Sequence, residues 1–404
     1  MATPAAGTAT AVAAGALLAL AAAVLCSPAT GDGASAAEST IRRHQQVVPA
    51  MYVFGDSLVD VGNNNFLPPP APMAAAERHG PPAGGLPPDQ ALHQRLQHRR
   101  HHRYASAVSS LRRLCSGEVH LGFKMSPPAY LSLTPLSSLH LLRGRGGANY
   151  ASGGSGILDI TGNGTITLRK QIQLFKETRA KIIRTGLVDC ERLDDLLAHS
   201  LFLISSGGND FDAFDNGVPI SQAPEFVAGM ITNYLERINE LYKLGARRLA
   251  LVDILPVGCL PSQRAITSNG ECDSNGNSVS QMFNALLRTE IAKAAVASMP
   301  CLKYSISSLY NTYSDMISNP HWPVKTACCG GGKFNGEVGC TMGSSLCADR
   351  DQYLFWDRVH GTQAAYCWAV VAFFYGPTRD AEPINIAQLM LEPLSMATAP
   401  YSSV

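Results

Sequence analysis

Three polar side chains in two distant segments of the chain could together carry out acyl transfer. Ser57 follows an apolar run, residues 47–54, so its hydroxyl group lies just beyond the expected end of a strand. Asp357 and His360 are three residues apart, which places both on one side of a turn. The carboxylate can then hold the imidazole in one tautomer, while the other ring nitrogen takes the serine proton. Each segment alone is a weak signal, because most Gly-Asp-Ser serines form turns and a D-x-x-H pair occurs by chance.

Two further segments could present N–H groups to a ligand. Residues 207–210 (GGND) place the side-chain amide of Asn209 directly after a second apolar run. Residues 146–156 (GGANYASGGSG) have a flexible backbone whose N–H groups can point at a bound molecule. This glycine-rich segment lacks the Lys of a phosphate-binding P-loop and the spacing of the dinucleotide fingerprint. No G-x-S-x-G sequence occurs, so the nucleophile elbow of the α/β-hydrolases is not predicted.

Strands and helices in alternation must position these groups. Residues 47–54, 201–205 and 248–254 are apolar runs that predict strands, and the first two end in Gly and polar residues. Apolar residues recur every three or four positions between 227 and 242, which predicts an amphipathic helix with Gly245 as its C-cap. Apolar strands that alternate with such helices predict a parallel sheet covered on both faces. Ligands of such sheets bind beyond the carboxyl ends of the strands.

Composition limits the classes of partner. The chain has 404 residues, of which 46% are hydrophobic and 16% charged, as in globular proteins. Its 32 Lys and Arg nearly balance 31 Asp and Glu, so the net charge is +1 and nothing attracts nucleic acid or an anionic membrane. The apolar run 364–375 is shorter than the roughly 20 residues that span a bilayer, which predicts a buried helix and no stable membrane insertion.

The N-terminus predicts secretion. Residues 11–25 are an unbroken apolar run, and residues 34–36 (Ala-Ser-Ala) form a cleavage site of the A-x-A type. Residues 1–36 therefore resemble a signal peptide, with an uncleaved anchor or a buried helix as the alternative. The remaining residues 37–404 are expected to form one domain outside the cell, in the cell wall or apoplast. Asn163 lies in the single N-x-S/T sequon, which agrees with secretion as a glycosylation site.

The cysteines support the same compartment. Cys259 and Cys272 bracket a loop rich in Gly, Ser and Asn, and an oxidising compartment closes such loops with disulfides. A second group of cysteines lies close together near the C-terminus: Cys328, Cys329, Cys340 and Cys347. We expect at least one of Cys328 and Cys329 to pair with Cys340 or Cys347. Their spacing is not that of a zinc site, so no metal is expected.

Taken together and in order, four segments resemble the GDSL esterase/lipase family of the SGNH hydrolases, in its plant secreted branch. FGDSLVDVGNNN (54–65) is similar to the first block of that family, and GANYASGGSGI (147–157) to the second. GGND (207–210) is similar to the third block and DRVH (357–360) to the fifth. The four segments in this order are far more specific than any of them alone.

The resemblance covers about residues 47–390 and implies a fold, an activity and a set of residue roles. The implied fold is α/β, a three-layer α/β/α sandwich with a central parallel sheet. The implied activity is hydrolysis of carboxylic esters through an acyl-serine intermediate, without a cofactor or metal. Ser57 would be the nucleophile, His360 the general base and Asp357 its partner. The implied oxyanion hole consists of two backbone N–H groups and one side-chain amide, those of Ser57, Gly154 (with the adjacent Gly153 as the alternative) and Asn209.

Two features depart from the family pattern. Gly361 follows the expected base where the family usually has Pro, so we expect a looser loop there. Residues 68–120 hold eight Pro, seven Arg and six of the eleven His against three acids, and show no helical or strand period. One interpretation is a basic disordered insert that binds an anionic partner. We favour a frame error in the gene, because residues 89–104, back-translated with ordinary codons and read one nucleotide later, give TRRFTNGYNIADIIA, a turn and a helix start.

Two functions remain open from the sequence. The first is a secreted ester hydrolase, for which a lipid ester, a cutin-type polyester and an acetylated polysaccharide are all possible substrates. The second is a catalytically impaired or non-enzymatic family member, in which residues 68–120 prevent proper folding. The two functions differ in whether residues 68–120 are genuine, and reading the transcript across codons 68–120 distinguishes them.

Overall fold

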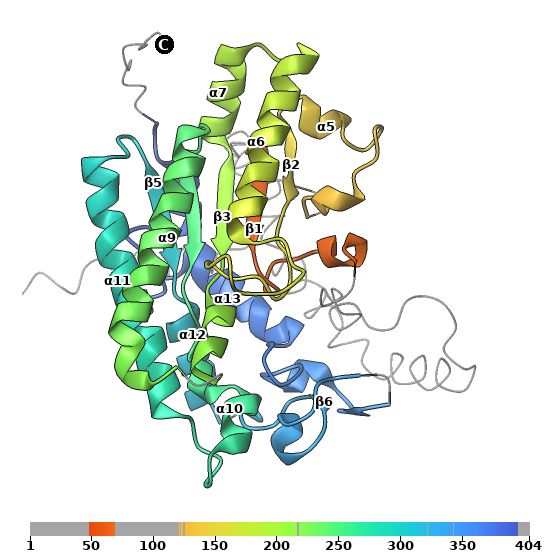
Figure 1. Ribbon diagram of the computed structural model, residues 1–404, viewed down its shortest axis with the longest axis vertical. Helices are drawn as coiled ribbons and strands as arrows, with labels where there is room; N and C mark the ends of the chain where they lie inside the picture. Colours follow the sequence, from red (N-terminus) through yellow and green to blue (C-terminus); the bar gives the residue numbers. More distant parts are fainter. Residues whose placement is uncertain are drawn as a thin grey trace, which may run out of the picture. The chain divides into compact units, whose positions relative to one another are not determined.

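A computed structural model describes residues 48–68, 121, 123, 126–215, 218–320, 322–341 and 343–394 (Figure 1). The expected signal peptide, residues 1–36, lies outside the described residues. The same is true of residues 69–120, which make up nearly all of the segment of anomalous composition.

Six strands form the central sheet, in the order β2-β1-β3-β4-β5-β8. Strands β1 to β5 run parallel to one another, and the short β8 pairs antiparallel with β5 at one edge. The three runs predicted as strands are β1, β3 and β4. The bounds are β1 Ala50–Gly55, β2 Gly146–Asn149, β3 Leu201–Ser205, β4 Arg248–Val252, β5 Lys303–Ser307 and β8 Ala381–Glu382.

Helices cover both faces of the sheet, which confirms the α/β/α sandwich. One core layer includes Tyr52 and Phe54 of β1, and the other includes Met51 and Val53, as expected for alternate residues of a strand. Figure 1 shows α9 and α11, which pack against each other in the first layer. The helices of the first layer are α6 Leu168–Thr185, α7 Cys190–His199, α9 Ala223–Lys243 and α11 Ser274–Ala297, and those of the second are α12 Leu309–Ser318, α13 Gln363–Tyr375 and α14 Ile386–Leu391.

Shorter elements connect these layers. A two-stranded antiparallel sheet is formed by β6 Cys329–Gly330 and β7 Ser345–Leu346. The short helices are α5 Leu139–Leu142, α8 Asp212–Asp215, α10 Pro261–Ile266, η1 Asn63–Phe66, η3 Tyr130–Ser132, η4 Gly208–Phe211, η5 Ile220–Gln222, η6 Val257–Cys259, η7 Lys333–Asn335 and η8 Arg350–Gln352.

Two predicted helices differ in detail from the expectation. The amphipathic helix is α9, whose C-cap is Leu244, while Gly245 lies one residue further on with φ 109°. The run predicted as a buried helix is α13, but only one side of it is buried, because Trp368 is 63% exposed and Tyr375 is 55% exposed. Among the described residues, no helix is both long and apolar enough to cross a membrane.

Candidate active site

Ser57 lies directly beyond β1, where the chain must turn sharply. Gly55, the last residue of the strand, has φ 138°, and a Cβ atom there would overlap the carbonyl of Ser205 in β3. The Asp56 N–H donates to that same carbonyl at 3.0 Å, so the pairing of β1 with β3 extends up to the residue before Ser57. The N–H of Asp60 then donates to the Asp56 carbonyl at 3.0 Å, which places Ser57 in the first turn after the strand.

A buried glutamine supports this turn from behind. The Gln171 side chain of α6 donates to the Gly55 carbonyl and accepts from the Gly55 N–H, both at 2.8 Å. The amide therefore satisfies both polar groups of the last residue of β1. No motif in the sequence indicates this role for Gln171. The available signal was a polar side chain on the helix face that also carries Leu168 and Phe175.

The three residues expected to form a triad are in hydrogen-bond contact. Ser57 Oγ lies 2.9 Å from His360 Nε2, and His360 Nδ1 lies 2.8 Å from Asp357 Oδ2. The other carboxylate oxygen of Asp357 accepts the backbone N–H groups of Val359 and His360, each at 2.8 Å. The side chain of Asp357 is 6% exposed and that of His360 is 26% exposed, so the imidazole is reachable from solvent while the carboxylate is not.

The protonation state of Asp357 follows from these contacts. Burial alone would raise its pKa, but the hydrogen bond and charge of His360, with the two backbone N–H groups, hold the pKa below its ordinary value. The carboxylate is therefore ionised at neutral pH, the state in which it accepts hydrogen bonds from the imidazole and from both N–H groups.

The loop that carries Asp357 and His360 is a tight hairpin. Phe355 and Gly361 form an antiparallel bridge, and the Trp356 N–H donates to the His360 carbonyl at 2.8 Å. Gly361 donates its N–H to Tyr366 Oη at 3.1 Å, and a Cβ atom at this position would overlap the hydroxyl of Tyr313. The structure therefore gives a reason for Gly at this position, because tyrosine side chains occupy the space that a larger residue would need; the expectation of a looser loop stays a prediction.

We expect Gly361→Ala to lower the free energy of unfolding by about 1–3 kcal/mol, the usual cost of an overpacked site. The cost should be smaller in a Tyr313→Phe background, which removes the overlapping hydroxyl, and a double-mutant cycle from thermal melts measures this difference. Gly339→Ala is the matched control, because a Cβ atom there meets nothing within 4 Å. Equal costs of Gly361→Ala in both backgrounds would contradict the assignment.

The glycine-rich segment after β2 faces Ser57. The Gly153 N–H donates to Asp60 Oδ2 at 3.0 Å, so it is already occupied. The N–H groups of Ser57 and Gly154, by contrast, have no acceptor within the part of the chain that the structure describes. Asn209 donates one N–H of its amide to the Ser155 carbonyl at 2.9 Å, and a side-chain amide has a second N–H to offer.

The polar residues after Ser57 hold this glycine-rich segment in place. The buried carboxylate of Asp60 also accepts the N–H of Asn63 at 2.8 Å. Asn63 donates to the carbonyls of Asn149 and Ala151 at 2.9 and 2.8 Å, and Asn64 donates to that of Gly153 at 2.8 Å. In the sequence these residues are visible only as part of the motif at residues 54–65. Their function in the structure is to join two segments that are far apart in the chain.

Asp210 has a similar role beside Asn209. Its buried carboxylate accepts the N–H groups of Ile157 and Leu158 at 2.8 and 3.0 Å and the hydroxyl of Thr161 at 2.7 Å. Burial raises the pKa of Asp210, while these three hydrogen bonds act in the opposite direction. The carboxylate thereby ties the loop after β3 to the glycine-rich segment and sets the position of Asn209.

Three disulfides join the six cysteines that the sequence singled out. They are Cys259–Cys272, Cys328–Cys347 and Cys329–Cys340. The last two lie beside the hairpin with Asp357, because the N–H groups of Cys328 and Cys329 donate to the carbonyls of Phe355 and Trp356 at 2.9 and 2.8 Å. The segment closed by the first disulfide contacts the other side of the hairpin, where the Ser262 N–H donates to the Arg358 carbonyl at 3.0 Å.

Because the hairpin is held between disulfide-linked segments, we expect Cys328→Ser/Cys347→Ser to lower the free energy of unfolding by about 2–4 kcal/mol. The rate per folded molecule should also fall. Non-reducing peptide mapping of the unmodified protein should show Cys259 linked to Cys272. The control is Cys190→Ser, which changes an exposed cysteine that has no disulfide. Free thiols at all six positions would contradict the structure.

A cavity of about 740 Å³ opens beside Ser57, and its lining also includes Asn209 and His360. The register of the sheet explains its place, since Gly55 is opposite Ser205 and Ser205 is opposite Val252. The carboxyl ends of β1, β3 and β4 therefore meet along one edge, where parallel sheets bind ligands. A serine, an imidazole and a carboxylate in this arrangement are typical of the serine hydrolases.

Comparison with known proteins agrees with this class. The chain matches the family described as GDSL-like Lipase/Acylhydrolase over residues 51–371. A GDSL esterase/lipase of Arabidopsis thaliana is 31% identical over 363 residues, which cover 86% of this chain and 90% of the relative. GDSL esterase/lipase 7 of the same plant is 32% identical over 369 residues, which cover 86% and 93%. The chain belongs to the GDSL lipase/acylhydrolase family, and it is a carboxylic-ester hydrolase.

Proposed function

We propose that the chain is a secreted serine hydrolase that cleaves carboxylic esters through an acyl-serine intermediate. The observation that carries the proposal is the line of hydrogen bonds from Ser57 through His360 to Asp357, at 2.9 and 2.8 Å. His360 Nε2 accepts the Ser57 proton as Oγ attacks the ester carbonyl carbon. The bond to the alcohol oxygen then breaks, and His360 returns the proton to the departing alcohol.

The second half of the cycle repeats the first with water. His360 takes a proton from a water molecule, whose oxygen attacks the acyl-serine carbonyl carbon. The bond to Ser57 Oγ then breaks, the proton returns to the serine, and the carboxylic acid leaves. Asp357 orients the imidazole and stabilises its positive charge in both halves.

The oxyanion formed in each half would be held by three donors. The unoccupied N–H groups of Ser57 and Gly154 support their assignment, and the occupied N–H of Gly153 argues against that alternative. Asn209 would contribute the second N–H of its side-chain amide. Such preorganised donors stabilise the negative charge more in the transition state than in the bound ester.

A phosphonate ester with a p-nitrophenol leaving group tests the proposal directly. We expect one equivalent of p-nitrophenol to be released and one phosphonyl group to be found on the peptide that contains Ser57. Peptide mass spectrometry locates the group, and prior incubation with an ester substrate should slow the labelling. If the chain is catalytically impaired, Ser57 will not be labelled.

Secretion is supported by the disulfides and by the place of the sequon. Three disulfides among the described residues fit an oxidising compartment. Asn163 lies in an exposed turn, where a glycan can be attached without disturbing the core. N-terminal sequencing of the protein exported by a plant host should then begin after the predicted cleavage site at residues 34–36.

A further inference from the structure

The cavity beside Ser57 has a floor of buried apolar side chains. Phe211 follows β3, Ile254 follows β4 and Val279 belongs to α11, and all three line the cavity. Their exposed fractions are 8%, 5% and 2%. Phe211 packs against Phe283 with ring centroids 6.3 Å apart, so the floor is continuous with the core layer beneath it.

Acidic residues also line the cavity, and internal contacts occupy the carboxylates of two of them, Asp253 and Asp273. Asp253 accepts from Arg288 at 2.8 Å, from Ser308 at 2.9 Å and from the Tyr310 N–H at 3.0 Å. Asp273 accepts the first N–H groups of α11, including that of Gly276 at 2.7 Å. These two carboxylates therefore hold the protein together rather than attract a cation. The buried lining also includes the hydroxyl groups of Ser205 and Ser206, and the apolar surface that it offers a ligand is that of the floor.

The directions imposed by the reaction decide which part of an ester faces this floor. The departing alcohol oxygen must lie next to His360 Nε2, and the carbonyl oxygen must lie at the N–H groups of Ser57 and Gly154. The hairpin with His360 packs with the second core layer through Phe355, whereas the floor belongs to the first core layer. The alcohol is therefore directed toward the hairpin, and the acyl chain toward the floor.

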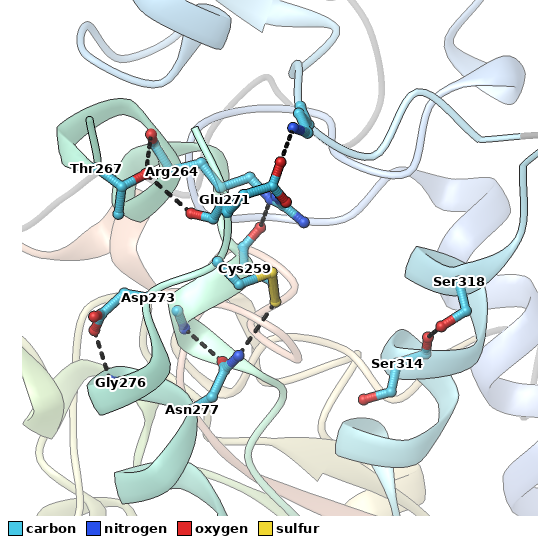
Figure 2. The surroundings of a disulfide bond; sticks show 12 residues. Cys259, Arg264, Thr267, Glu271, Asp273, Gly276, Asn277, Ser314 and Ser318 are labelled. Atoms are coloured by element: carbon cyan, nitrogen blue, oxygen red, sulfur yellow. Dashed lines mark hydrogen bonds and ion pairs between the residues drawn. A yellow bond between two sulfur atoms is a disulfide. The ribbon is translucent and has the colours of Figure 1, made fainter. Parts of the chain in front are cut away.

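Another part of the cavity lining, here called the wall, is held by a disulfide and by hydrogen bonds. It includes Val257, Leu260 and Ile266, which lie in or beside the segment closed by the Cys259–Cys272 disulfide. Figure 2 shows the buried side chain of Arg264 beside Cys259, whose carbonyl accepts a hydrogen bond from its guanidinium at 3.1 Å. The guanidinium also donates to the Gly270 carbonyl at 3.1 Å. Because the disulfide and these hydrogen bonds already hold the wall in place, binding an apolar chain there does not require the wall to become ordered first.

We propose that the cavity is the subsite for the acyl group and that the protein prefers esters of aliphatic acids with several methylene groups. The inference rests on the proposed function. An acetyl group would leave the floor of Phe211, Ile254 and Val279 uncovered, so an acetylated polysaccharide fits this cavity less well than an ester of a longer aliphatic acid. Each methylene that reaches the floor should raise kcat/KM by about fourfold.

The test compares p-nitrophenyl acetate, butyrate, hexanoate and octanoate, which share one alcohol. For the unmodified protein we expect kcat/KM to rise along the series. Val279→Phe, which adds volume at the floor, should lower the ratio of octanoate to acetate values by roughly tenfold or more. The control is Val296→Phe on the same helix, where the side chain is 87% exposed and the ratio should not change.

The series with the unmodified protein keeps the test decisive even if Val279→Phe does not fold. A flat or falling series would overturn the acyl subsite, as would a Val279→Phe variant that folds and lowers acetate and octanoate hydrolysis equally. A flat series that still depends on Ser57 leaves the proposed function intact. If no ester in the series is hydrolysed, the proposed function itself fails.

Discussion

Ser57→Ala is expected to lower kcat/KM for p-nitrophenyl butyrate by about 10⁴-fold or more, leaving the fold unchanged. The hydroxyl is the group that would form the covalent intermediate, and without it His360 has no nucleophile to activate. Any remaining rate would come from binding and from the oxyanion donors alone. A burst of p-nitrophenol from the unmodified protein, absent from the variant, shows that the lost step is acylation.

The control for this experiment is Ser278→Ala, which removes an exposed hydroxyl that donates to a carbonyl within α11 at 2.8 Å. Both variants should keep the melting temperature of the unmodified protein within a few degrees, since neither side chain supports the core. Activity retained by Ser57→Ala in a preparation free of other esterases would refute the assignment of the nucleophile.

Asn209→Ala should have the next largest effect, a decrease in kcat of roughly 10²–10³-fold with little change in substrate binding. The reason is that its amide N–H would contact the oxygen of the substrate only when that oxygen becomes negatively charged. The rate should be measured per active site by titration with the phosphonate, so that partial unfolding does not count as slow catalysis.

A purely structural role for Asn209 predicts a different result. Its amide also donates to the Ser155 carbonyl at 2.9 Å, so a structural role would appear as a lower melting temperature with an unchanged rate per active site. Asn233→Ala is a matched control, because that amide donates to the Gly229 carbonyl at 2.9 Å on an exposed part of α9. A decrease in kcat that exceeds any loss of stability assigns Asn209 to the oxyanion hole.

Local patterns in the sequence predicted β1, β3 and β4 of the six-stranded sheet, the helices α9 and α13, and the candidate residues of the site. Apolar runs that end in Gly and polar residues mark β1 and β3, because a buried parallel strand needs apolar side chains on both faces and its end does not. The three-to-four-residue period of apolar side chains predicted α9, because a helix that packs on a sheet buries one face. Short spacings suggested the Asp357–His360 pair and the disulfide between Cys259 and Cys272, since both pairs can meet across one turn or loop.

Only the tertiary structure decided the contacts between distant segments. The register of β1 against β3 brings Ser57 to the edge where His360 arrives from 303 residues further along the chain. Whether Gly153 or Gly154 has an unoccupied N–H depends on Asp60, and no spacing in the sequence reveals that hydrogen bond.

Three other features were likewise decided only in three dimensions. Gln171 could be recognised as a support only once α6 was placed against the end of β1. One side of α13 is exposed, although its sequence is apolar all round. The floor of the cavity combines side chains that follow two strands with one from a helix. The sequence by itself determined which groups can react, because side-chain chemistry is a local property; their geometry and the shape of the binding site depend on packing between segments that are remote in the chain.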